Sequence, residues 1–326
     1  MGSKPEATIV ARSSPMRRVL ALAERVAASD ATVLVTGESG TGKELLARFI
    51  HARSSRARKP FQAINCGALS ETLLESELFG HVQGAFTGAV RDHAGFFAAA
   101  HRGTLFLDEV AETSSAVQVK LLRALQEHTV RPVGATRDVA VDVRLIAATN
   151  RDLAAMVAER TFRKDLYFRL RVVALEIPPL RDRRDDILPL ARAFIARSCR
   201  ENQCGPCALG AEALDLFMAH DWPGNVRELE NAIERAVVLA EGKPRIEAAD
   251  LPPEIRQPAP RAHDADDGQV TTLAELERGH ILATLARLDG DRPATARALG
   301  ISDNTLWRRL KQYGLVEPRR SRRRTR

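Results

Sequence analysis

The order of apolar and polar residues divides the chain into a mixed front part and a helical rear part. From residue 19 to about 177, short apolar runs alternate with stretches whose apolar residues recur at helical spacing. The runs typical of strands are Thr32–Val35, Thr104–Leu107, Arg144–Ala148 and Val172–Ile177, and the helical stretches are Val19–Ala28, Glu44–Ala52 and Ala116–Glu127. This alternation predicts an α/β fold, with a parallel sheet that carries helices on both faces.

The rear part of the chain is predicted to be helical and to contain one linker. After Pro178-Pro179 the pattern stays helical through about Leu239, which indicates a separate small helical domain. Four prolines between residues 252 and 260, followed by the polar segment His263–Gly268, are typical of a flexible linker. We therefore expect domains at residues 1–178 and 179–251, a linker at 252–270, a compact unit at 271–316 and a tail at 317–326.

Length and hydropathy exclude some classes of protein. A chain of 326 residues is long enough for two or three domains. No apolar run approaches the roughly 20 residues that a membrane-spanning helix needs, and the N-terminus lacks the apolar core of a signal peptide. We expect a soluble cytoplasmic protein without a membrane segment.

The positive charge is concentrated at the C-terminal end. Residues 271–316 carry seven Lys and Arg against five Asp and Glu, and residues 317–326 carry six Arg against one Glu. These two segments supply the whole formal charge of +7, so residues 1–270 are balanced. A neutral body with a basic end indicates contact with nucleic acid at that end, although the Arg-rich tail alone is equally typical of a solvated, disordered segment.

The four cysteines do not predict a chemical role. They are Cys66, Cys199, Cys204 and Cys207, too few for a disulfide scaffold. Cys204-Gly-Pro-Cys207 has the form of a dithiol redox motif, with Cys199 as a third thiol nearby. However, a thioredoxin-type site needs a βαβ setting, and a metal site needs a fuller ligand set. A loop with incidental thiols is the favoured interpretation.

A phosphate-binding loop is predicted at residues 37–44. The residues Gly37, Glu38, Ser39, Gly40, Thr41, Gly42, Lys43 and Glu44 follow a predicted strand and open a predicted helix. Backbone N–H groups of such a loop surround phosphates, the helix N-terminus adds positive potential, and the lysine reaches the β and γ oxygens. The generic motif ends in Ser or Thr, which helps to hold Mg²⁺. Because Glu44 takes that place, the metal must depend more on other carboxylates.

Two carboxylates end the second predicted strand. Asp108 and Glu109 follow the apolar run Thr104–Leu107, and a strand end beside a phosphate loop is where ligands sit in an open α/β sheet. Asp108 is suited to hold Mg²⁺, and Glu109 is suited to orient and deprotonate an attacking water. A merely solvated strand end is the alternative, but the phosphate loop favours hydrolysis of ATP.

A hexapeptide between these motifs fits neither a helix nor a strand. It consists of Gly84, Ala85, Phe86, Thr87, Gly88 and Ala89. One large apolar side chain and one hydroxyl between glycines are typical of a loop tip. An exposed Phe86 on an ATPase indicates contact with another protein. The alternative is a Phe packed into the core beside a turn, as most lone Phe residues are.

The C-terminal unit has the pattern of three helices with capping residues. Thr272 and Glu275 form a capping box for a helix through Leu288, and Pro293 suits the first turn of a second helix that ends at Leu299-Gly300. Ser302 is suited to cap a third helix, 303–313, which Gly314 stops. We expect a helix-turn-helix with Leu299, Ile301, Leu306 and Leu310 in its core. The residues expected to face DNA are Asn304, Thr305, Arg308 and Arg309. A generic three-helix bundle is the alternative.

Taken together, these motifs resemble the sigma-54-dependent transcriptional activators, which are bacterial enhancer-binding proteins of the NtrC type. The resemblance extends from about Ile9 to Leu315, and the hexapeptide is its most specific segment, because other AAA+ branches do not carry it. The other matching segments are Glu77–His81, Gly103–Glu109, Phe162–Leu170 and Trp222–Leu229. The family's phosphate loop commonly ends in Glu, as it does here at Glu44. The resemblance implies an AAA+ P-loop core, an all-α lid and a Fis-type helix-turn-helix domain.

The resemblance also implies roles for residues that spacing alone does not assign. Asn65 matches the residue that holds the catalytic glutamate in an inactive pose, and Thr149-Asn150 match the first nucleotide sensor. Arg163 and Arg169 match the arginine fingers that reach the γ-phosphate of a neighbouring subunit, and Arg227 matches the second sensor. Without the resemblance, surface ion pairs would be the default interpretation of these arginines.

The activity implied by the resemblance is transcription activation driven by ATP. Such a protein binds enhancer DNA, assembles as a hexameric ring from an inactive dimer, and uses ATP and Mg²⁺ to remodel the closed complex of sigma-54 RNA polymerase into an open one. One alternative is a DNA-binding regulator that uses ATP without engaging sigma-54, and another is a remodeller or helicase of a different AAA+ branch.

Only about eight residues precede the region of resemblance, so we expect the chain to lack the family's N-terminal receiver or sensor domain. Control would then come from a separate regulatory protein, a partner activator or expression level, unless the chain is a fragment.

Overall fold

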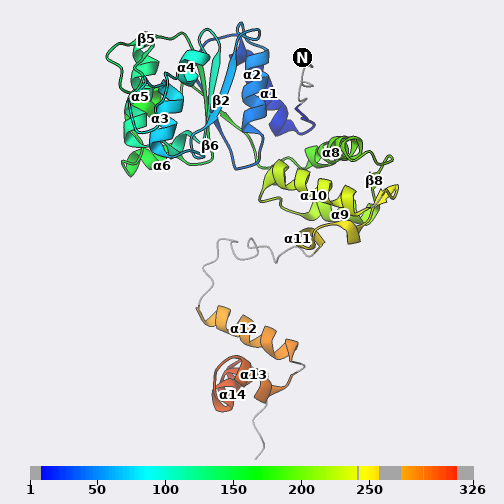
Figure 1. Ribbon diagram of the computed structural model, residues 1–326. Coiled ribbons are helices and arrows are strands. Elements are labelled where there is room, and N and C mark those ends of the chain that lie inside the picture. The colour runs from blue at the N-terminus through cyan, green and yellow to red at the C-terminus, as the bar shows by residue number, and fades with distance from the viewer. Residues whose placement is uncertain (1–8, 241, 257–272, 289, 314–326) are drawn as a thin grey trace, which may run out of the picture. The chain divides into compact units, whose positions relative to one another are not determined.

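The computed structural model describes residues 9–240, 242–256, 273–288 and 290–313 (Figure 1). The chain forms two compact units, residues 1–259 and residues 260–326. Within the described ranges, every helix is too short or too polar to traverse a bilayer.

A five-stranded parallel sheet is the centre of the first unit. Its strands are β1 (Val33–Thr36), β2 (Phe61–Asn65), β3 (Thr104–Asp108), β6 (Arg144–Thr149) and β7 (Val173–Glu176), in the spatial order β2-β3-β6-β1-β7. All neighbouring strands run parallel. The parallel sheet and the four predicted strands are confirmed. The sequence did not predict β2, which among the described residues is an edge strand paired with β3 alone.

Helices cover both faces of this sheet, because successive strand residues point to opposite sides. In β1, Val33 and Val35 pack in one apolar cluster and Leu34 packs in the other. The helices α1 (Ser14–Ala27) and α2 (Lys43–Ala52) supply the first cluster. The second cluster is supplied by α3 (Glu71–Phe79), α4 (Gly95–Ala99), α5 (Ser115–Glu127), α6 (Leu153–Ala158) and α7 (Lys164–Leu170). A short antiparallel pair, β4 (Thr129–Val130) and β5 (Val139–Ala140), follows α5.

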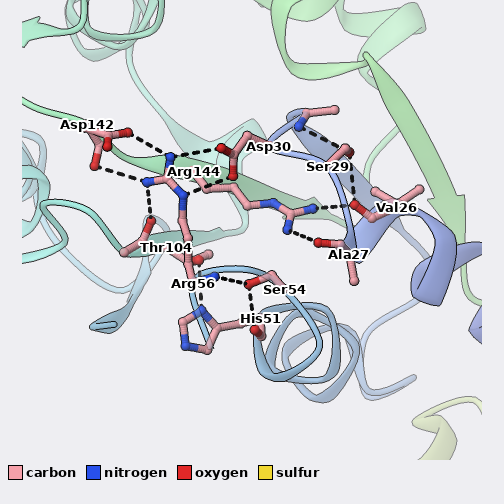
Figure 2. Close-up of polar contacts among 12 residues, drawn as sticks. Val26, Ala27, Ser29, Asp30, His51, Ser54, Arg56, Thr104, Asp142 and Arg144 are labelled. Carbon is pink, nitrogen blue, oxygen red and sulfur yellow. Dashed lines mark hydrogen bonds and ion pairs between the residues drawn. The ribbon is translucent and has the colours of Figure 1, made fainter. Parts of the chain in front are cut away.

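A polar network fixes the amino edge of the sheet (Figure 2). Arg144, which opens β6, is 1% exposed and donates to the carbonyl oxygens of Val26 at 2.9 Å and Ala27 at 3.0 Å. Arg56 forms ion pairs with Asp30 at 3.0 Å and with Asp142 at 2.8 Å. Burial of an ionised guanidinium is tolerated only with such partners. The network joins the ends of α1 and α2 to the starts of β3 and β6, and it lies at the opposite edge from the phosphate loop.

A small helical lid follows the sheet. It contains α8 (Ile187–Glu201), α9 (Ala211–Ala219), α10 (Asn225–Leu239) and α11 (Pro253–Arg256), which were expected to be helical up to Leu239. A parallel pair of two-residue strands, β8 (Ala208–Leu209) and β9 (Arg245–Ile246), interrupts the helices. Trp222 is fully buried in the lid core and donates from Nε1 to the Phe217 carbonyl at 2.9 Å.

The first five residues of the predicted linker, 252–256, pack with the lid. Pro253–Arg256 form α11, and Ile255 is only 2% exposed in the lid core. Leu251 also belongs to this core. Residues 252–256 are therefore part of the lid, because their apolar side chains are packed there. The remainder of the predicted linker lies outside the described residues.

The described residues of the second unit form three helices, as predicted. They are α12 (Leu273–Arg287), α13 (Arg292–Ala298) and α14 (Asp303–Gln312), and a core of Ile281, Ala296, Leu306 and Leu310 joins them. The partly buried Leu299 and Ile301 pack against this core. The Ser302 hydroxyl accepts the Thr305 N–H at 3.2 Å, which confirms the predicted cap of α14. The predicted capping box at Thr272, the stop at Gly314 and the tail at 317–326 lie outside the described residues.

Candidate functional site

The glycine-rich loop joins β1 to α2, so the predicted strand–loop–helix context is confirmed. Gly40 and Gly42 have φ values of 77° and 102°, a conformation that favours glycine. Space is also restricted, because a β-carbon at Gly40 would lie 2.3 Å from the carbonyl oxygen of Gly224. Within the loop, the Thr41 hydroxyl donates to the Glu38 carbonyl at 2.8 Å. A folded loop at a helix N-terminus has the geometry that binds phosphate.

Lys43 is the first residue of α2 and is only 9% exposed. Its ammonium group donates to the carbonyl oxygens of Gly37 at 2.9 Å and Glu38 at 3.1 Å. Burial lowers the pKa of Lys43, and the nearby carboxylates of Asp108 and Glu109 oppose that shift. The loop therefore holds a partly desolvated cation that faces two carboxylates.

Asp108 and Glu109 lie at the carboxyl end of β3. Burial raises the pKa of Asp108, while the charge of Lys43 lowers it. The Glu109 N–H donates to Oδ1 of Asp108 at 3.0 Å. Glu109 has a φ of 54°, a left-handed conformation that is uncommon for a residue with a side chain and that clusters at functional sites. This turn ends the strand at the edge where Lys43 lies.

Asn65 lies at the end of β2, directly opposite Asp108 in the strand register. Its Oδ1 accepts the Gly67 N–H at 2.8 Å. A β-carbon on Gly67 would lie 2.5 Å from Oε2 of Glu109 and 3.4 Å from Oδ1 of Asn65. The Glu109 carboxylate and the Asn65 amide therefore both lie against the α-carbon of Gly67. Among the described residues, no hydrogen bond joins Asn65 to Glu109.

The residues present fit a magnesium ion that is held jointly by protein and substrate. Mg²⁺ usually takes one or two carboxylates together with phosphate oxygens rather than an all-protein cage. Within the described ranges, no three His, Cys, Asp or Glu side chains are grouped as a metal site. Asp108 supplies a half-buried carboxylate whose raised pKa a divalent cation would lower. Glu44 is exposed and bonded to Arg48 at 2.6 Å, so its carboxylate is engaged on the helix surface.

Thr149 and Asn150 lie at the end of β6, on the same edge of the sheet. Thr149 pairs in register with Thr36, the last residue of β1 before the phosphate loop. The Thr149 side chain is fully buried, and its hydroxyl accepts the Arg151 N–H at 3.0 Å. Asn150 is exposed. The ends of β1, β3 and β6 thus bring the predicted sensor beside the loop and the carboxylates.

The lid contacts the phosphate loop through the start of α10. The Val226 N–H donates to the Gly40 carbonyl at 3.0 Å. Asn225 is fully buried, and its Nδ2 donates to Oε2 of Glu38 at 3.0 Å and to the Ser39 carbonyl at 3.1 Å. Its Oδ1 accepts the Leu180 N–H at 2.7 Å. A single amide therefore connects the loop, the lid and the segment that joins the lid to the sheet.

Glu38 is the charged centre of this contact. Arg181 binds it through two parallel hydrogen bonds, of 2.9 Å and 2.6 Å. The Arg181 guanidinium and the Asn225 amide hold the pKa of Glu38 below its usual value, against the effect of burial. The sequence assigned no role to Asn225 or Arg181. The sequence signal for these partners was Glu38 itself, because a carboxylate within a phosphate loop needs a cation or a donor beside it.

The predicted arginines occupy two kinds of position. Arg227 donates from Nη1 to the Ser39 hydroxyl at 3.1 Å, so it lies beside the phosphate loop. Arg163 precedes α7 and is paired at 2.6 Å with Asp165, and Arg169 donates to the Leu125 carbonyl at 2.9 Å. Among the described residues, neither Arg163 nor Arg169 is hydrogen-bonded to the phosphate loop or to Asp108 and Glu109.

The hexapeptide forms a closed loop. The Gly84 N–H donates to the Ala89 carbonyl at 2.9 Å, and the Ala89 N–H donates to the Phe86 carbonyl at 3.0 Å. Gly84 and Gly88 have φ values of 79° and 106°. The expectation of an exposed Phe86 is wrong for this conformation. Phe86 is half-buried, with its ring edge-on to that of His81 at 5.0 Å between centroids. An apolar ring packs against any neighbour that shields it from water.

The base of the loop is fixed by His81. Its backbone exchanges two hydrogen bonds of 2.9 Å with His93. Its Nδ1 lies 2.7 Å from the hydroxyl of Ser76 in α3. The large apolar side chain that is most exposed next to the hexapeptide is Val90, at 79%. The hexapeptide is therefore a hydrogen-bonded loop whose base is held by the contacts of His81.

Of the four residues predicted to face DNA, three are exposed on α14 and one is half-buried. Asn304, Thr305 and Arg308 are exposed. Arg309 is half-buried and paired with Glu277 of α12 at 3.0 Å. Trp307 is 40% exposed, with the ammonium of Lys311 5.3 Å from its ring centroid. Asn304, Trp307, Arg308 and Lys311 follow the spacing i, i+3, i+4, i+7, so they form one exposed stripe. Sequence reasoning missed Trp307 and Lys311.

Comparison with known proteins agrees with this architecture. Residues 9–176 match the family described as the sigma-54 interaction domain, residues 181–268 match the AAA+ ATPase lid domain, and residues 272–313 match the Fis family of bacterial regulatory proteins. The fold and the site thus define an AAA+ protein with a helix-turn-helix domain. The chain belongs to the sigma-54-dependent activator family.

Similar proteins are bacterial regulators. The chain is 51% identical over 303 residues to the transcriptional regulatory protein ZraR of Klebsiella oxytoca, which covers 93% of this chain and 68% of that protein. It is 48% identical over 313 residues to the regulatory protein AtoC of Escherichia coli K12, covering 94% and 68%. The crystal structure of NtrX from Brucella abortus in complex with ATP is similar with a TM-score of 0.73 and 36% identity, covering 94% of this chain and 70% of that one.

Proposed function

We propose that this chain is an ATP-driven transcription activator that acts on RNA polymerase containing sigma-54. The observation that carries this proposal is the closed loop Gly84–Ala89, which is held by His81 in the same domain as Lys43, Asp108 and Glu109. The loop contributes little to the core, so a partner protein accounts for its composition better than packing does. Membership of the sigma-54-dependent activator family supports the same partner.

ATP would bind at the carboxyl edge of the sheet. The backbone N–H groups of residues 37–42 and the Lys43 ammonium would bind its phosphates, and Ser39 and Arg227 lie where the lid meets that loop. Nucleotide binding is supported by the ATP complex of the similar protein NtrX. Thr149 and Asn150 would respond to the γ-phosphate from the end of β6.

Hydrolysis would depend on the two carboxylates of β3. Glu109 would orient the attacking water and accept its proton. Asn65 lies against Gly67 as Glu109 does, and it would hold the Glu109 carboxylate in an inactive position before hydrolysis begins. Asp108 would hold Mg²⁺, which supplies charge neutralisation for the phosphates when it is bound. The electrostatic coupling of Lys43 with both carboxylates supports this division of roles.

A second subunit would complete the site. Arg163 and Arg169 contact neither the phosphate loop nor the two carboxylates within the described part of their own chain, which is what fingers acting in trans require. A guanidinium that reaches the γ-phosphate of a neighbour raises the hydrolysis rate on the order of 10³-fold or more. Activity would therefore require a ring, which we propose to be a hexamer that forms from an inactive dimer.

The hydrolysis cycle would move Phe86 off His81 and against sigma-54. Phe86 has one aromatic neighbour and two flanking glycines with positive φ, so leaving this position disturbs no large core.

The stripe formed by Asn304, Trp307, Arg308 and Lys311 would bind enhancer DNA in the major groove.

Open-complex formation by sigma-54 RNA polymerase tests this function. The purified chain should support ATP-dependent opening of a promoter that carries its binding site, and Phe86→Ala and Thr87→Ala should lose opening while they keep ATP hydrolysis within about threefold. The exposed Val90→Ala is the matched control and should retain opening. If both loop variants open promoters as well as the wild type does, the chain is better described as an ATP-using DNA-binding regulator that does not engage sigma-54.

A further inference from the structure

Three thiols converge in the lid, away from the phosphate loop. Cys199 lies in the last turn of α8, and Cys204 and Cys207 lie in the loop that leads to β8. All three line one groove of about 800 Å³, whose walls are mainly apolar and include Ile195 and Leu214. Cys199 belongs to the lid core, and the other two pack against that core. The proposed ATPase cycle uses none of these thiols.

The backbone brings two of these residues within disulfide range. The Cys204 N–H donates to the Cys199 carbonyl oxygen at 3.0 Å. Adding the covalent distances from that nitrogen and that oxygen to their own α-carbons gives an upper limit of roughly 7 Å between the α-carbons. Disulfides usually span roughly 4.4–6.8 Å between α-carbons. The hydrogen bond therefore holds the two α-carbons near or within the range that a disulfide spans.

Burial and charge give the thiols different reactivity. Burial, with the neighbouring Cys204 and Cys207 thiols, raises the pKa of Cys199 to about 11, and a backbone N–H from Cys207 partly opposes this shift. Cys199 is thus a poor first nucleophile. Cys204 is half-buried and open to the groove. A metal ion is a weaker interpretation, because no set of three ligating side chains in the described chain has the arrangement of a metal site.

We propose that Cys199 and Cys204 form a reversible dithiol–disulfide switch in the lid, which small-molecule disulfides oxidise. The Cys204 thiolate attacks one sulfur of the small disulfide, a mixed disulfide forms, and one thiolate leaves. The Cys199 thiolate then attacks the Cys204 sulfur, the intramolecular disulfide forms, and the second thiolate leaves. Two protein thiols are oxidised and one small disulfide is reduced, and its two leaving thiolates take up the two protons that the protein thiols lose.

The proposed disulfide would tie the end of α8 to the loop that lines the groove. The Cys207 backbone partly opposes the raised pKa of Cys199, which favours the thiolate needed for the second step. Cys66 stands outside this chemistry, because its burial raises its thiol pKa to about 12. The inference does not depend on the proposed activator function.

The test treats the full chain with oxidised glutathione, followed by thiol counting and peptide mapping. Two of the four thiols should be lost, with a single Cys199–Cys204 cross-link that dithiothreitol reverses. Cys199→Ala should instead trap glutathione on Cys204, and Cys204→Ser should react at least tenfold more slowly. Cys207→Ser is the matched control and should still form the cross-link.

Two outcomes would overturn the proposal. One is a cross-link between Cys204 and Cys207, and the other is loss of no thiols under conditions that oxidise a model dithiol peptide. Since Cys199 lies in the lid core, the unfolding midpoint of Cys199→Ala is measured first, and Cys199→Val replaces it if the variant does not fold. Trapped glutathione on either variant supports the proposal.

Discussion

Asn225 and Glu38 are separated by 187 residues, and the amide nitrogen of Asn225 donates to Oε2 of Glu38 at 3.0 Å. Asn225 is the first residue of α10 in the lid, and Glu38 lies within the phosphate loop. Because Asn225 also accepts the Leu180 N–H, a shift of the lid is transmitted to the loop through one side chain. The position of the lid and the shape of the nucleotide site are therefore coupled.

Replacement of Asn225 by Asp isolates this coupling. Aspartate tolerates the φ of 54° at this position and still accepts the Leu180 N–H, but it places a carboxylate against Glu38. We expect ATP affinity to fall by about tenfold and unfolding free energy to fall by about 1–3 kcal/mol, because a buried donor is lost and like charges meet. Nucleotide titration and chemical denaturation measure both effects.

The control for Asn225→Asp is Asn202→Asp, at a residue whose amide contacts only Ser198 of the lid. That variant should bind ATP as the wild type does. In a double-mutant cycle with Glu38→Gln, the coupling energy should be about 1 kcal/mol or more. Substitutions at independent sites usually add to within about 0.3–0.5 kcal/mol. A coupling energy below about 0.3 kcal/mol would therefore show that the two side chains act independently.

Glu109→Gln should separate binding of ATP from its hydrolysis. The amide cannot accept the proton of water, so we expect the hydrolysis rate to fall by about 10²–10⁴-fold while ATP affinity changes by less than about threefold. Lys43→Ala should instead weaken binding itself, since the cation beside the loop is removed. Steady-state hydrolysis and nucleotide titration distinguish the two variants.

Glu112→Gln serves as the matched control for Glu109→Gln. Glu112 lies three residues further along, is paired with Arg151 at 3.2 Å and is part of the same turn. Its substitution should leave hydrolysis within about twofold of the wild type. Equal losses in the two variants would argue against Glu109 as the base.

The free energy of unfolding should decrease as the pH is lowered below about 6.5, and His51 should contribute to this decrease. Burial and the charge of Arg144 lower the pKa of His51 in the folded state, where its ring nitrogen contacts Thr104 at 2.9 Å. Above the unfolded pKa of about 6.5 both states are neutral and His51 adds no pH dependence. Below it the unfolded state takes up a proton that the folded state resists, so stability is lost as the pH falls.

Thermal unfolding at pH 7.5 and pH 5.5 measures this effect. The decrease in unfolding midpoint should be smaller for His51→Gln than for the wild type, although the variant is less stable at neutral pH. The exposed His280→Gln should show the wild-type decrease. A decrease of equal size in all three proteins would assign the pH dependence to other groups.

Arg308 and Arg309 should contribute differently to DNA binding. Arg308 is exposed, whereas Arg309 must leave Glu277 before it can contact DNA. We expect Arg308→Ala to weaken binding by about 1–3 kcal/mol. Arg309→Ala should weaken it by less and should lower the stability of the C-terminal unit by about 0–1 kcal/mol. Fluorescence titration at several salt concentrations measures affinity and its salt dependence, and a larger loss for Arg309→Ala would reverse this assignment.

Pattern alone predicted β1, β3, β6 and the edge strand β7, and it missed the other edge strand, β2. The runs that became β1, β3 and β6 are apolar on both faces of a covered sheet, so their composition is distinctive. In β2, Gln62 interrupts a short run, and most of its residues are only partly buried. An edge strand gains part of its stability from pairing with β3, and local composition does not contain that information.

The site was predictable where its chemistry is local. Lys43 and the carboxylates Asp108 and Glu109 occur in compact motifs whose residue types follow from phosphate and metal binding. The contact of Asn225 with Glu38 joins distant segments, and the edge-on contact of Phe86 with His81 depends on how the loop closes. These relationships depend on tertiary packing, which no window of the sequence contains.

The close approach of Gly40 to the Gly224 carbonyl has a consequence for which substitutions this protein tolerates. With no room for a β-carbon at Gly40, even a single methyl group would act as a wedge between the lid and the phosphate loop. The contact between lid and loop thus requires a residue without a β-carbon, and any larger side chain would force one of the two to shift. Gly40→Ala would disturb both the contact with the lid and the phosphate loop itself, because the φ of 77° at this position strains a residue that carries a β-carbon.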